Sequence, residues 1–173
     1  MSLRNFLGET ALHTAAKHAD VELCDVLINA DSEGTLVHAV DNQGYTALHI
    51  ASSTTSPELV DLLLNYGASP RSVDATNSTP VHIAAALSGS APVLDLLLRH
   101  GGSAHSRNGV GASAIHLAVL HDLHESVSCL LRHVVATASD ECGESDTDVC
   151  TKAAISAKST KVLKVLSRYG MWI

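Results

Sequence analysis

The amino-acid sequence predicts an all-α fold in which helix-turn-helix units stack into one elongated array. First, a short segment that ends in histidine occurs four times, and its histidines (His13, His49, His82 and His116) lie 36, 33 and 34 residues apart. Second, an apolar segment follows each copy after a short break. Third, 46% of the residues are hydrophobic but only 3% are aromatic, so Leu, Val, Ile and Ala must fill the core. These side chains suit thin, closely packed helices, and a period of roughly 20–50 residues is typical of repeat folds.

The first helix of each unit is predicted from the repeated motif. The copies span 8–13, 44–49, 77–82 and 111–116, and a degenerate fifth spans 148–154. Each copy holds a residue that can cap a helix by accepting hydrogen bonds from free backbone amides. These residues are Thr10, Thr46, Thr79, Ser113 and Asp148. Pro80 stands at a first helical position, where its missing N–H does no harm. The core positions of the motif are predicted to be Leu12, Leu48, Val81 and Ile115.

The second helix of each unit is predicted from apolar segments over 21–28, 59–64, 93–98, 127–131 and 162–166. Ser56 and Pro57 repeat the arrangement of a cap followed by proline. Gly67, Gly101 and Gly170 are placed to end three of these helices in the left-handed conformation. The stretches between units are too short for another helix, so we expect them to form projecting hairpins.

Two departures from the pattern concern the last part of the chain. An acidic, Ser/Thr-rich loop is expected over 134–147 in place of a turn that ends in glycine. Residues 137–140 and 145–148 resemble acid-directed phosphorylation sites. We favour a solvated linker instead, because such short motifs often match by chance. The fifth unit carries polar Lys152, Ser156 and Lys158, which is expected of a unit that caps the array.

The motif resembles the ankyrin repeat, whose signature of about 33 residues contains Thr-Pro-Leu-His-x-Ala. The resemblance covers nearly the whole chain. It implies an ankyrin-repeat solenoid and a single domain over 1–173, with approximate repeats 5–37, 41–73, 74–107, 108–142 and 143–173. It also implies that the four motif histidines bind the capping residue and neighbouring loop carbonyls and do not act in catalysis.

Composition and charge exclude several classes of function. A net charge of −7 at pH 7 argues against nucleic acid and anionic membranes as partners, because both would repel the chain. No apolar run reaches the roughly 18 residues that span a bilayer, and no secretory signal opens the sequence. Four cysteines without paired spacing favour an intracellular protein, cytoplasmic or nuclear, in which Cys24 and Cys129 pack as small apolar side chains.

The sequence contains no arrangement that predicts an enzyme, a metal site or a bound cofactor. His121 and His124 could offer two metal ligands on one helical turn, but no third ligand stands at a recognisable spacing. Neither a nucleophile elbow nor a glycine-rich phosphate loop is present. We therefore expect a non-catalytic chain.

The resemblance implies a concave groove, formed by hairpin tips and first helices, that binds another protein. Several outward positions there have no role in the repeat pattern and are predicted to contact a partner. They are Phe6, Leu7, Lys17, His18, Gln43, Tyr45, Thr54, Leu87, Val110, Leu120 and His121. An alternative for Phe6 and Leu7 is that they pack on a further repeat upstream.

The leading hypothesis is a monomeric protein-interaction module within a larger scaffold or regulatory protein. Two alternatives stay open: a regulatory ankyrin domain of an enzyme or channel, and an inhibitor-like protein that masks a basic surface.

Overall fold

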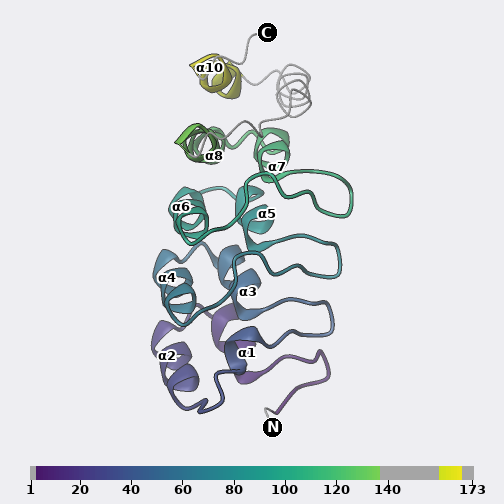
Figure 1. Cartoon of the computed structure of the whole chain (residues 1–173), viewed down its shortest axis with the longest axis vertical. Coiled ribbons are helices and arrows are strands. Elements are labelled where there is room, and N and C mark those ends of the chain that lie inside the picture. Colours follow the sequence, from purple (N-terminus) through teal and green to yellow (C-terminus); the bar gives the residue numbers. More distant parts are fainter. Residues whose placement is uncertain (1–2, 137–159, 169–173) are drawn as a thin grey trace.

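A computed structural model describes residues 3–136 and 160–168, and the chain there forms helices joined by loops (Figure 1). The helices are α1 (Ala11–Lys17), α2 (Val21–Asn29), α3 (Ala47–Thr54), α4 (Pro57–Asn65), α5 (Pro80–Ala85), α6 (Ala91–Arg99), α7 (Ala114–Leu120), α8 (His124–Ala136) and α10 (Thr160–Arg168), with a short 3-10 helix η1 (Leu36–His38). No β-strand occurs among the described residues, and one isolated bridge pairs Arg107 with Ser113. The predicted all-α fold is confirmed.

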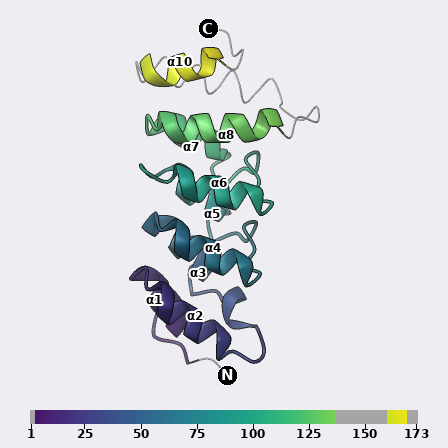
Figure 2. The same cartoon turned by 90° about the vertical axis from the view of Figure 1, so that its left-hand side faces the viewer.

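The helices lie in two layers that run along the array. The shorter helices α1, α3, α5 and α7 pack on one another in one layer, and α2, α4, α6, α8 and α10 pack on one another in the second layer (Figures 1 and 2). The loops that lead into α3, α5 and α7 project from the first layer, away from the second. The first layer and its loops therefore form one side of the molecule.

Each helix of the first layer begins at a reciprocal cap. Thr10, Thr46, Thr79 and Ser113 are the N-cap residues, as predicted, and the histidine three residues later completes the cap in each case. In the second layer, Ser56 caps α4 by accepting a hydrogen bond from the backbone N–H of Leu59. Pro57 is the first residue of this helix, as predicted. The fifth predicted cap, Asp148, lies outside the described residues.

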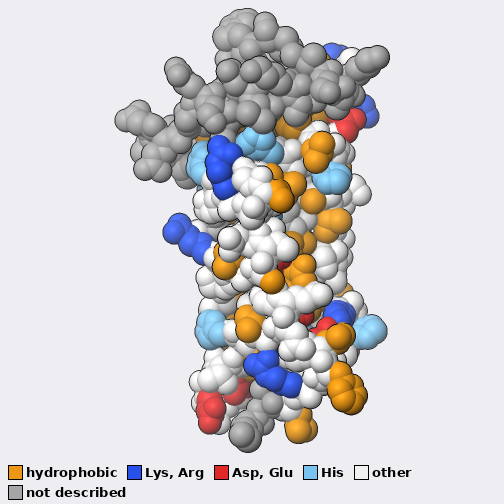
Figure 3. All heavy atoms as spheres, turned by 90° about the vertical axis from the view of Figure 1, so that its right-hand side faces the viewer, with side chains coloured by type: hydrophobic (Ala, Val, Ile, Leu, Met, Phe, Trp, Pro, Cys, Tyr) orange, Lys and Arg blue, Asp and Glu red, His pale blue; other side chains and the backbone are white. Residues whose placement is uncertain are grey.

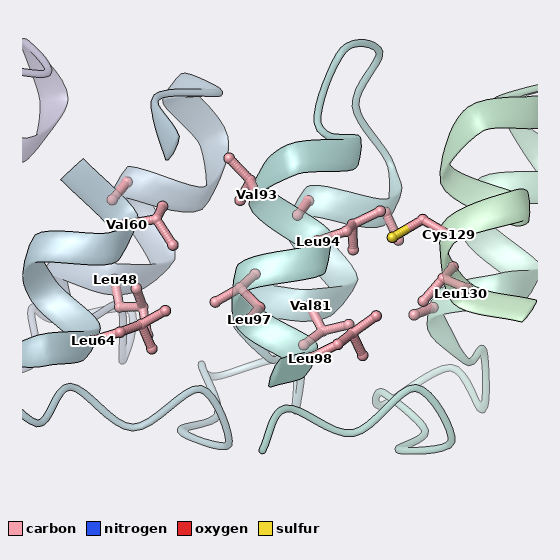
Figure 4. Packing of buried hydrophobic residues seen from close by; sticks show 14 of the residues in the cluster. Leu48, Val60, Leu64, Val81, Val93, Leu94, Leu97, Leu98, Cys129 and Leu130 are labelled. Carbon is pink, nitrogen blue, oxygen red and sulfur yellow. The ribbon is translucent and has the colours of Figure 1, made fainter. Parts of the chain in front are cut away.

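The core runs between the two layers and is built mainly from leucine, valine and alanine (Figure 4). The four predicted motif positions, Leu12, Leu48, Val81 and Ile115, are all buried. Cys24 and Cys129 are buried as well, as predicted, and burial raises the pKa of the Cys24 thiol to about 11.

The ends of the second-layer helices correct one prediction. Gly67 and Gly101 follow α4 and α6 with φ of 86° and 90°, the left-handed conformation expected of them. In α8 the position that corresponds to Gly67 and Gly101 is occupied by Val134. A β-branched residue is strained in the left-handed conformation, so Val134 does not end the helix. The helix α8 therefore continues to Ala136, and the loop predicted to begin at residue 134 begins later.

The rest of the predicted loop, from residue 137, lies outside the described residues, and so do Gly170 and the polar residues Lys152, Ser156 and Lys158. The apolar segment 162–166 lies within α10, as predicted. Because most of the fifth predicted unit is not described, the division of the chain into five repeats stays a prediction.

The first unit has an apolar face that no described residue covers. Leu23 of α2 is 45% exposed, whereas Leu59 of α4 and Val93 of α6, at the same position in the next two units, are 0% exposed. A hollow of about 400 Å³ lies there, between α1 and α2. It is lined by Ala11, Thr14, Ala15, His18, Asp20, Leu23 and Leu27.

Candidate partner-binding groove

An Asn or Asp residue closes each projecting hairpin. In the second hairpin, the Asp41 N–H donates to the Tyr45 carbonyl (2.9 Å), and its carboxylate accepts from the N–H groups of Gln43 (2.8 Å) and Tyr45 (2.9 Å). The same bonds recur in the other hairpins around Asn5, Asp74 and Asn108. We did not predict this role. The signal was available, because these four residues have the same spacing as the motif histidines.

Neighbouring hairpins are joined by backbone hydrogen bonds. The N–H of Asn42 donates to the Leu7 carbonyl (3.0 Å), and the N–H of Ala75 donates to the Gln43 carbonyl (2.9 Å). The third bond is the shortest, at 2.7 Å from the Gly109 nitrogen to the Thr76 oxygen. The hairpins thus form one connected edge along the array.

The motif histidines tie each first helix to the following hairpin. The Thr46 N–H donates to Nδ1 of His49 (3.1 Å), and Nε2 of the same ring lies 3.2 Å from the Ser78 carbonyl, to which it donates. His13 and His82 make equivalent contacts with the carbonyls of Tyr45 (2.9 Å) and Ala112 (3.2 Å), and Nε2 of His82 also lies 2.8 Å from the Ser106 carbonyl. Burial lowers the pKa of both His49 and His82 and so keeps these rings neutral. The predicted structural role is confirmed for these three histidines.

A groove of about 470 Å³ lies where the first two hairpins meet the first helices. Ile50, Ile83 and the half-buried ring of Tyr45 give it apolar walls, and Leu7 adds to them. The Tyr45 ring stands edge-on to the His49 ring, with centroids 5.7 Å apart. Burial, together with the nearby carboxylates of Asp74 and Asp41, raises the pKa of the Tyr45 hydroxyl.

An ion pair is part of the lining of the groove. Lys17 contacts the buried carboxylate of Glu9, which also accepts a hydrogen bond from the Asn5 amide (2.8 Å). The bond from Lys17, followed by the one from Asn5, lowers the pKa of Glu9. The expectation that the outward positions have no role in the fold is therefore wrong for Lys17. It is also wrong for Tyr45, whose ring packs on the ring of His49 and whose carbonyl accepts a hydrogen bond from His13.

The structure brings together four of the predicted contact residues, because Leu7, Lys17, Gln43 and Tyr45 all line the groove. It does not bring the others there. Those that are exposed elsewhere are Phe6, Val110, Leu120, His121 and His18, the last of which lines the hollow between α1 and α2. Thr54 and Leu87 are half-buried, and the Thr54 hydroxyl donates to the Ala51 carbonyl (2.8 Å).

Two groove residues, Ile50 and Ile83, were not predicted. Each directly follows a motif histidine, so its position in the repeat was available as a signal.

A family model described as "Ankyrin repeats (3 copies)" matches residues 1–74 and 57–140. The chain belongs to the ankyrin-repeat family. Ankyrin repeats are in general protein–protein interaction modules, and no curated protein matches this ankyrin-repeat chain.

The described part of the ankyrin-repeat chain has neither a cluster of metal ligands nor a helix that could span a membrane. Within residues 3–136 and 160–168, no three His, Cys, Asp or Glu side chains come together in a way that could hold a metal ion. None of the helices described is both long enough and apolar enough to span a lipid bilayer.

Proposed function

We propose that this ankyrin-repeat chain is a non-enzymatic module that binds a partner protein through its hairpins and first helices, as part of a larger scaffold or regulatory protein. The observation that carries the proposal is the groove around Tyr45, whose apolar walls stand on a frame of hydrogen-bonded hairpins. A preorganised frame favours binding, because little conformational entropy is lost when a partner docks.

Exposed apolar residues support the same side of the molecule. Leu7, Val110 and Leu120 are all more than half exposed, and they belong to the hairpins or to the first helices. Burying one such side chain contributes roughly 1.5–3 kcal/mol. Tyr45 is the expected anchor, since tyrosine is enriched among residues that dominate binding energy.

Affinity capture from cell extract tests the proposal, with wild-type chain compared with Tyr45→Ala and Leu120→Ala. Tyr66→Ala is the matched control, because Tyr66 is also a partly exposed tyrosine (39%) but lies at the end of α4 in the second layer. We expect the two hairpin-side variants to lose proteins that wild type and Tyr66→Ala both retain. If all four baits recover the same proteins in the same amounts, the assignment of the binding side is wrong.

A further inference from the structure

The charged side chains on the hairpin side are all used within the chain. We define the hairpin side as residues 4–18, 38–54, 71–87 and 105–121, which cover the four projecting hairpins and the first helices. Its Lys, Arg, Asp and Glu residues are Arg4, Glu9, Lys17, Asp41, Arg71, Asp74 and Arg107. Four are basic and three acidic, so the hairpin side has a net charge of +1 and the chain's −7 comes from other residues.

The arginines bind backbone carbonyls of the loops. Arg71 donates from Nε to the Gly101 carbonyl (2.7 Å), and Arg107 donates to the Gly111 carbonyl (2.8 Å). Arg4 donates to the Gly8 carbonyl (3.0 Å) and also contacts the Val40 carbonyl. Each of these arginines therefore stabilises a loop by binding a backbone carbonyl.

The acidic side chains are bound by backbone N–H groups of the hairpins or by Lys17. The Asp74 carboxylate accepts from the N–H groups of Thr76 (2.7 Å) and Ser78 (2.8 Å). Burial alone would raise the pKa of Asp74, but these bonds and that of the Thr76 hydroxyl outweigh it and lower the pKa. Asp41 holds its own hairpin in the same way, and Glu9 is paired with Lys17. A partner that drew on any of these charges would have to compete with the bonds that shape the hairpins.

Two uncharged polar side chains that line the groove are also bound within the chain. The Asn42 amide donates to the Phe6 carbonyl (3.1 Å), and the Ser53 hydroxyl donates to the Ile50 carbonyl (2.7 Å). The exposed side-chain amide of Gln43 makes no hydrogen bond to any described residue. It can therefore offer one donor and one acceptor site to a bound chain without disturbing the fold.

Figure 3 shows the hairpin side in space-filling form. Hydrophobic side chains are spread over its length, and acidic side chains are few. In the second layer, Asp25, Asp61 and Asp95 occupy the same position of α2, α4 and α6. The net negative charge of the chain therefore gives the hairpin side no attraction for a basic partner.

We propose that the groove binds an uncharged segment of the partner protein. A bulky apolar side chain of that segment, aromatic or branched aliphatic, rests on Tyr45, Ile50 and Ile83, and the Gln43 amide pairs with an adjacent peptide group. This inference rests on the function proposed above. The inference favours neutral over basic and acidic segments, since the charged side chains that line the groove, Glu9, Lys17 and Asp41, are engaged within the chain.

Selection from a random peptide library displayed on phage tests the inference, with the full chain as bait. Binders are sorted by whether they still bind Tyr45→Ala and Gln43→Ala, with Tyr66→Ala as the control. We expect the groove-dependent binders to share an uncharged aromatic or branched aliphatic anchor. They should lose at least about tenfold in affinity on Tyr45→Ala, which is at the lower end for an anchor residue. Their Kd should change by less than about twofold between low and physiological salt.

The outcomes separate the two proposals. Groove-dependent binders with Arg, Lys, Asp or Glu anchors, and with affinity that falls steeply with salt, overturn this inference but leave the hairpin side as the binding side. A selection without any groove-dependent binder also overturns the inference, and affinity capture then decides the proposed function by itself. Because Tyr45 packs on His49, folding of Tyr45→Ala is checked by circular dichroism. Gln43→Ala, at an exposed position, gives a second result that does not depend on that packing.

Discussion

Two leucines at the same position of successive units provide a matched test of the packing. Leu59 of α4 is 0% exposed, because the first unit covers it, whereas Leu23 of α2 is 45% exposed. Replacing a buried leucine by alanine costs the transfer of its side chain and the cavity that it leaves, together about 2–5 kcal/mol. Leu23 keeps close to half of its surface in water and leaves no closed cavity, so Leu23→Ala should cost about 1 kcal/mol.

The measurement is urea unfolding of wild type, Leu23→Ala and Leu59→Ala, followed by circular dichroism. We expect the free energy of unfolding to fall by at least about 1 kcal/mol more for Leu59→Ala than for Leu23→Ala. In a chain of this length that difference corresponds to about 2–4 °C in Tm per kcal/mol. Equal losses would mean that the first unit is covered as fully as the second, and that the reasoning from stacked units is wrong.

Two further predictions concern the frame that carries the groove. The pKa values of His49 and His82 are lowered from 6.5, so the unfolded chain binds protons first as the pH falls. Stability should be unchanged above about pH 7 and should decrease as the pH is lowered below about 6.5. Urea titrations at several pH values check this, and constant stability across that range would contradict the neutral rings. Gly109→Ala would place a Cβ 2.7 Å from the Thr76 carbonyl oxygen, and we expect a loss of about 1–3 kcal/mol in thermal or urea unfolding. Gly34→Ala meets no atom within 4 Å and serves as the control, although its positive φ adds some strain. If both alanine variants are equally stable, the contact between hairpins is not close.

The features that could be predicted from the sequence are those that depend on local spacing. The caps at Thr46 and Thr79 and the role of His49 follow from residues three positions apart, so the motif alone specifies them. The early end predicted for α8 failed because it rested on the expected length of the repeat. Whether a residue ends a helix depends on its own backbone preferences, and Val134 lacks those of Gly67 and Gly101.

The groove was harder to predict, because it depends on which residues of different units come together. Leu7, Tyr45 and Ile83 belong to three successive units, and no local sequence pattern shows that they line the same groove. Phe6 is adjacent to Leu7 in sequence but does not line the groove, which illustrates how the direction of a hairpin side chain decides its neighbours.

The histidine contacts give the array a direction. The ring of His13 holds the hairpin of the second unit, and the ring of His82 holds that of the fourth, so each hairpin is clamped by the unit before it. The hairpin around Asn5 has no such clamp among the described residues. It is joined to the second hairpin through the N–H and side chain of Asn42 and through Arg4, which contacts the Val40 carbonyl. Loss of one histidine ring should therefore loosen the hairpin of the following unit more than the hairpin of its own unit.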